Sequence, residues 1–189
     1  MVKSIVTILA LLLIATSGCN HGSSTSTKES TPTQGSTVDL LAPMSITLDN
    51  EGRFADGSSW TLTVKSDRSA VLETRTFPDA KKRAFMLTPK QMADFRMALQ
   101  SERFFDLADE YGQIVPSGST QTITIQSGNE TKIVKLHFLM NWVHNDPARL
   151  VEPARAVRVW RHARQWFDDN DAVDRGRYDQ MVLDAVANR

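Results

Sequence analysis

Residues 87–105, LTPKQMADFRMALQSERFF, decide the fold because they contain the most clearly defined helix start in the chain. Thr88 can cap the helix, Pro89 suits its first position, and Gln91 completes a T-x-x-Q capping box. Three apolar side chains then recur at helical spacing: Met92, Phe95 and Leu99. The stretch therefore predicts an amphipathic helix that needs an apolar surface to cover, and its flanking sequences must supply that surface.

The sequence before this helix predicts a β-hairpin. Apolar and polar side chains alternate from Trp60 to Lys65, which is the pattern of a half-buried strand. Turn-forming residues follow at 66–68, and the run 69–77 supplies a second strand. Residues 45–48 can add a further strand before the hairpin.

The sequence after the helix predicts a second hairpin and then another helix. Residues 121–125 and 133–138 alternate in polarity on either side of a Ser-Gly-Asn-Glu turn. The last major helix begins near Pro147 and ends near Phe167, and a start around Val151 is favoured because proline is tolerated only in the first turn. A short helix around residues 178–185 can pack on the edge of the domain.

These elements predict an α+β domain in the order β-β-α-β-β-α. We expect a small antiparallel sheet of two hairpins with two helices packed on one face, within a single domain at residues 44–189. From Thr61 to Phe167 the pattern is similar to that of uncharacterised bacterial envelope domains. That likeness implies no activity.

Composition and charge exclude several classes of protein. The chain has 189 residues, of which 41% are hydrophobic, and its 22 Lys and Arg balance 22 Asp and Glu. A net charge of zero gives no reason to expect nucleic-acid binding, and the apolar content is too high for full disorder. The single cysteine, Cys19, cannot form an intramolecular disulfide.

The N-terminus predicts export. Lys3 precedes an apolar core at residues 5–14, which is shorter than the roughly 20 residues of a spanning helix and is typical of a signal peptide. The segment ATSGC at residues 15–19 resembles the lipobox of bacterial lipoproteins, with Thr16 where that family usually has leucine. The resemblance implies cleavage of residues 1–18 and a diacylglyceryl group on Cys19.

Residues 19–43 are expected to connect the lipid to the domain. The stretch is rich in Ser, Thr, Gly and Pro, which favours a flexible tether. Each buried methylene contributes about 0.8 kcal/mol, so two or three acyl chains would hold the protein on the membrane almost permanently. Asn20 is not the aspartate that retains some lipoproteins in the inner membrane, which favours the outer membrane.

One face of the last helix is rich in arginine. The residues of interest are Arg155, Arg158 and Arg161. We hypothesise that they bind an anionic partner, such as a cell-surface polymer, through bidentate contacts. The alternative is an ordinary solvated helix face that is balanced by the aspartates just downstream.

The sequence carries no strong catalytic or metal-binding motif. It lacks G-x-S-x-G, the P-loop, the dinucleotide fingerprint and H-E-x-x-H. His137, expected to be a solvated surface residue, lies seven positions before His144, and Asp146 follows. The leading hypothesis is a lipid-anchored envelope protein, without cofactor or metal, that binds a protein or glycan. The alternative is a small periplasmic hydrolase or metal-dependent enzyme that uses these three residues.

Overall fold

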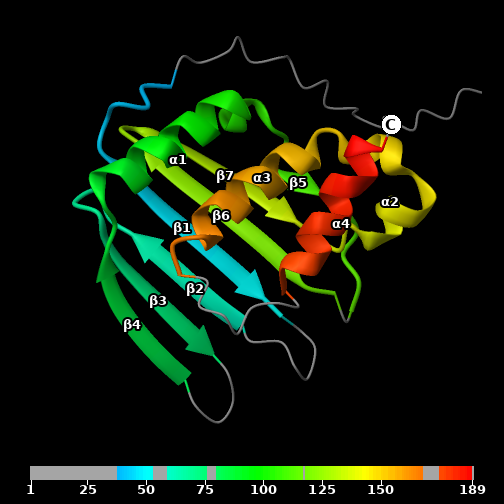
Figure 1. Cartoon of the computed structure of the whole chain (residues 1–189), viewed down its shortest axis with the longest axis horizontal. Helices are drawn as coiled ribbons and strands as arrows, with labels where there is room; N and C mark the ends of the chain where they lie inside the picture. Colours follow the sequence, from blue (N-terminus) through cyan, green and yellow to red (C-terminus); the bar gives the residue numbers. More distant parts are fainter. Residues whose placement is uncertain (1–37, 53–58, 76–79, 117, 168–174, 189) are drawn as a thin grey trace, which may run out of the picture. The chain divides into compact units, whose positions relative to one another are not determined.

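A computed structural model describes residues 38–52, 59–75, 80–116, 118–167 and 175–188. Their strands form a seven-stranded sheet in the order β4-β3-β2-β1-β6-β7-β5. Helices α1 and α3 lie across one face of the sheet, and α2 and α4 lie beside α3 toward the β5 edge (Figure 1).

The described strands are β1 Met44–Glu51, β2 Ser59–Val64, β3 Ser69–Arg75, β4 Ala80–Met86, β5 Glu110–Tyr111, β6 Thr120–Ser127 and β7 Glu130–Leu136. The α-helices are α1 Pro89–Ser101, α2 Met140–Asn145, α3 Pro153–Arg164 and α4 Arg175–Ala187, and 3-10 turns span Phe104–Asp106 and Pro147–Leu150. Strand pairs are antiparallel except for β5 and β7, which are parallel.

The prediction of a small antiparallel sheet with two helices was wrong. The α+β character holds, but the sheet is mixed and has seven strands, and the described residues include four α-helices. The two predicted hairpins exist as β2–β3 and β6–β7. The additional strands are β1, which was left open as an option, and β4 and β5, which were not predicted.

Strand β1 lies at the centre of the sheet and joins the two hairpins. Leu48 pairs with Leu62 of β2 on one side and with Ile123 of β6 on the other. Leu72 and Val134 continue the same row into β3 and β7. Because every second residue of a strand faces the same side, this register places an aliphatic row across five strands under the helices.

Strands β4 and β5 were not predicted because neither sequence alternates apolar and polar residues. Strand β4 has the sequence AKKRAFM and is largely exposed. An edge strand needs only one neighbour, and charged side chains on it discourage further pairing. Strand β5 is two residues long, so it depends on contact with β7 rather than on its own sequence.

The capped helix was predicted correctly. The Thr88 hydroxyl accepts a hydrogen bond from the Gln91 backbone N–H at 3.1 Å, and the Gln91 side chain accepts one from the Thr88 N–H at 2.8 Å. Met92, Phe95 and Leu99 are buried. Helix α3 also buries an apolar face, with the Trp160 ring centroid 5.1 Å from that of Trp60.

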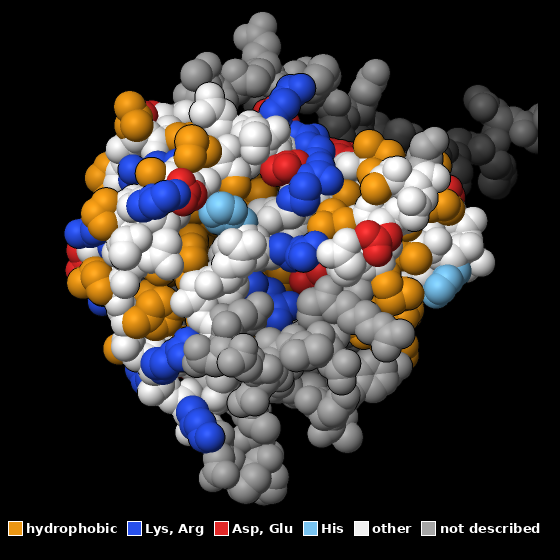
Figure 2. Space-filling view, viewed as in Figure 1, with side chains coloured by type: hydrophobic (Ala, Val, Ile, Leu, Met, Phe, Trp, Pro, Cys, Tyr) orange, Lys and Arg blue, Asp and Glu red, His pale blue; other side chains and the backbone are white. Residues whose placement is uncertain are grey.

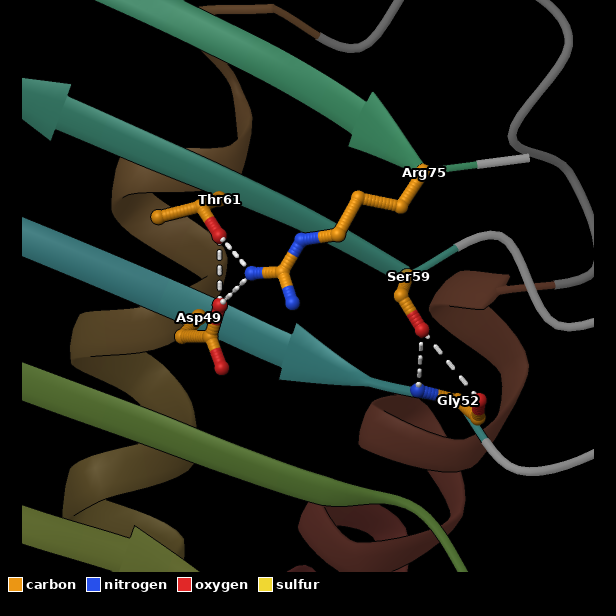
Figure 3. Close-up of polar contacts among 5 residues, drawn as sticks. All are labelled: Asp49, Gly52, Ser59, Thr61 and Arg75. Carbon is orange, nitrogen blue, oxygen red and sulfur yellow. Dashed lines mark hydrogen bonds and ion pairs between the residues drawn. The ribbon is translucent and has the colours of Figure 1, made fainter. Parts of the chain in front are cut away.

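The other face of the sheet carries polar side chains that contact one another. Arg75 reaches from β3 across β2 and pairs with Asp49 of β1 at 2.8 Å, while Thr61 bonds to both (Figure 3). Lys82 pairs with Glu73 at 2.6 Å in the same way. This face is therefore covered by an internal network of charges and hydroxyls.

We predict that Phe95→Ala lowers the free energy of unfolding by about 3–5 kcal/mol, because it removes a fully buried ring between the sheet and α3. Met97→Ala on the same helix, at a side chain that is 60% exposed, should change it by less than about 0.5 kcal/mol. Urea unfolding followed by circular dichroism measures both. Equal losses for the two variants would contradict the placement of α1.

Candidate functional site

The arginines of the last helix contact their own chain. Arg155 donates to the backbone carbonyls of Glu102 and Arg103 at 2.7 and 2.9 Å, just after the end of α1. Arg158 pairs with the Glu102 carboxylate at 2.7 Å. Arg161 donates to the Gln180 side chain of α4 at 2.8 Å. These contacts connect α3 to its two neighbouring helices.

Figure 2 shows a band of Lys and Arg across the helix layer with Asp and Glu beside them. Since Arg155, Arg158 and Arg161 already bond to acceptors of the protein, an anionic partner would have to compete with those acceptors. Binding of an anion at this face stays a prediction.

Cys19 lies outside the described residues, as do the predicted signal peptide and most of the predicted tether. Strand β1 begins at Met44, where the sequence places the start of the domain. Among the described helices, none combines the length and the apolar character needed to cross a bilayer.

The three residues of the enzyme hypothesis occupy different surroundings. His137 lines a small pocket, which we call the inner pocket, and His144 of α2 lines a neighbouring depression, which we call the outer cleft. Asp146 is not among the described lining residues of either and pairs with Arg149 at 3.7 Å. No group of three His, Cys, Asp or Glu side chains in the described part of the chain could hold a metal ion.

The outer cleft is a wide depression that is open to solvent. Its volume is about 580 Å³, within the range of about 300–1,000 Å³ that is usual for small-molecule pockets. Its described lining residues are uncharged or histidine: Gln113, Val115, Phe138, Met140, Asn141, His144, Asn145 and Tyr178. The side chain of Tyr178 is 55% exposed, so an aromatic surface is accessible at the cleft.

A chain of amide hydrogen bonds runs along the outer cleft. Asn145 donates to the Asn141 side-chain oxygen at 2.6 Å, and Asn141 donates to that of Gln113 at 2.8 Å. The first two residues lie one helical turn apart on α2, while Gln113 comes from the segment after β5. The chain of bonds therefore fixes the orientation of amides that originate far apart in sequence.

Gly112 allows the segment that carries Gln113 to pass close to the backbone of His137. Its φ is +92°, and a Cβ atom at this position would lie 2.7 Å from the carbonyl oxygen of His137. A residue with a side chain would meet both backbone strain and a steric clash. The chain therefore passes close to the end of β7. There Gln113 pairs with Phe138 in an isolated antiparallel bridge.

The inner pocket shares Phe138, Met140 and Tyr178 with the outer cleft but holds only about 40 Å³. His137 lies at this pocket with its Nδ1 atom 3.2 Å from the Thr120 hydroxyl. Its Nε2 atom is buried and has no hydrogen-bond partner among the described residues. His137 was expected on the solvated surface, and the structure places it half-buried instead.

Asp179 of α4 is the carboxylate of the inner pocket, and it is almost fully buried. Burial raises the pKa of this carboxyl, while contacts with Gln121 at 3.3 Å and Arg164 at 3.5 Å oppose the rise. Arg164 is itself only 5% exposed. No pattern in the sequence indicates this buried pair of Arg164 and Asp179.

No protein-family model matches the chain, and no curated protein is similar to it.

The sequence could have revealed part of this site. Three amides and a tyrosine at positions 113, 141, 145 and 178 form no motif, because their separations reflect the fold rather than a local pattern. The Tyr111-Gly112 pair does not by itself indicate that the chain passes close to His137. The spacing of Asn141 and Asn145 by four residues was a usable signal, provided that α2 had been predicted.

We predict that the unmodified chain loses stability relative to Asp179→Asn as the pH rises. The folded state holds the Asp179 proton more tightly than the unfolded state does, so this contribution is complete below the ordinary value of 3.8. It is lost as the pH rises through the raised folded-state pKa. Urea unfolding of both proteins between acidic and neutral pH measures the difference. A difference that moves in favour of the unmodified chain would mean that pairing with Arg164 outweighs burial.

Proposed function

We propose that this protein is a lipid-anchored binding module of the bacterial cell envelope, with the outer membrane favoured. The lipobox-like sequence at residues 15–19 supports the anchor, and the Ser/Thr-rich residues that follow support a tether between lipid and domain. The observation that carries the binding role is the outer cleft, with its oriented amides and exposed Tyr178. Its partner is a component of the envelope.

Binding is favoured over catalysis because the three residues of the enzyme hypothesis, His137, His144 and Asp146, do not line one common pocket. His137 bonds to Thr120 in the inner pocket, His144 is exposed on the outer cleft, and Asp146 pairs with Arg149. A hydrolase needs a base and a stabilising group within reach of one reacting atom. The lining of the outer cleft offers hydrogen bonds and apolar contacts, which hold a ligand without reacting with it.

We predict that replacing Cys19 with serine abolishes lipidation. When the chain is produced in a bacterium fed labelled fatty acid, the label should follow the unmodified protein and should be lost from Cys19→Ser. The unmodified protein should fractionate with the membranes. Ser23→Ala in the tether is the matched control and should keep the label. Mass spectrometry of the mature N-terminus that finds an unmodified chain cut elsewhere would contradict the anchor.

We predict that the outer cleft contacts an envelope component in living cells. A photoreactive phenylalanine analogue in place of Tyr178, which lines the cleft and is 55% exposed, should form crosslinks to that component. The same analogue at Met97 on α1 serves as the control and should not form them. Identical crosslinking from both positions, or none from position 178, would argue against binding at the cleft.

A further inference from the structure

We propose that the outer cleft binds an uncharged saccharide that carries acetamido groups. This inference rests on the proposed binding function of the cleft and assigns the chemistry of its ligand. It draws on the charge of the lining, the amide chain and the exposed aromatic ring.

The charge of the lining favours an uncharged ligand. None of the described residues that line the outer cleft is Lys, Arg, Asp or Glu. Asp179, the carboxylate of the inner pocket, already contacts Gln121 and Arg164, and Asp146, which follows Asn145, pairs with Arg149. Among the described lining residues, a charged ligand group would therefore find no partner of opposite charge. Figure 2 agrees, since the surface over α2 and α4 is mainly hydrophobic or uncharged.

The amide chain favours a ligand that both donates and accepts hydrogen bonds. Each amide side chain has two N–H donors and an oxygen acceptor, and the bonds from Asn145 to Asn141 to Gln113 use only part of that capacity. Sugar hydroxyls and acetamido groups can engage the remaining donors and acceptors. Because the amides already hold one another in place, little side-chain ordering is needed when the ligand binds.

The apolar part of the cleft matches the rest of such a sugar. Tyr178 exposes a ring with an apolar face and a polar hydroxyl, on which the C–H face of a pyranose can stack. Val115, Phe138 and Met140 supply apolar contacts beside the amides, where the methyl of an acetamido group can lie. A plain glucan would leave these apolar contacts unused.

The probe is the tetrasaccharide of β-1,4-linked N-acetylglucosamine, titrated calorimetrically into the full chain in a detergent without a sugar headgroup. We expect it to bind, and we expect cellotetraose, which lacks the acetamido groups, to bind at least about tenfold more weakly. Tyr178→Ala and Asn141→Leu should each weaken binding by about tenfold or more. Met97→Ala should leave it unchanged, and urea unfolding checks that each variant folds.

The outcomes separate this inference from the proposed function. Failure of the acetamido sugar to bind, with crosslinking of a protein from position 178, overturns the saccharide assignment and leaves the binding module intact. Failure of both experiments overturns both proposals. Equal affinity for the two tetrasaccharides, or unchanged affinity in Tyr178→Ala, overturns the assignment of acetamido recognition to this cleft.

Discussion

Strand β1 has to match two neighbouring strands and two faces at once, and the rest of the structure depends on that match. Met44, Ile46 and Leu48 face the helices, while the residues between them face the polar side. A shift of one residue against either hairpin would bring polar side chains under α1 and α3. The register of β1 therefore fixes the apolar surface on which the helices pack, and the helices in turn position every element of the candidate site.

The helices are also held together by arginines of α3 that the sequence pattern predicts to face solvent. Arg155 and Arg158 fasten α3 to the end of α1, and Arg161 and Arg164 contact α4. A helical wheel separates the apolar face from the arginine face correctly, but it contains no information about which neighbouring helix will supply acceptors. An arginine-rich face can therefore serve as an inter-helix connection as readily as a binding surface, because backbone carbonyls at a helix end are strong acceptors.

The sequence predicted the elements that are stabilised by contacts between residues close in sequence. It did not predict the elements that form only by pairing with a distant part of the chain. Thr88 and Gln91 cap α1 with contacts inside a single turn, so the sequence alone was sufficient. Strand β4 has no alternation and pairs only because β3 presents an edge to it. The candidate site belongs to the second kind, since Gln113, Asn141 and Tyr178 meet only after β5 has paired with β7 and α4 has packed.

Two polar surfaces of the domain differ in what they leave available to a ligand. On the open face of the sheet, Arg75 already bonds to Asp49 (Figure 3), and Lys82 bonds to Glu73, so these charges are neutralised within the protein. At the outer cleft the regular strands have ended, and the amides keep donors and acceptors beyond those used in their mutual bonds. The apolar side chains Val115, Phe138 and Met140 lie beside these amides, so one ligand can make both kinds of contact. The irregular end of the domain is therefore better suited to recognition than the polar face of the sheet, where the charges already bond to one another.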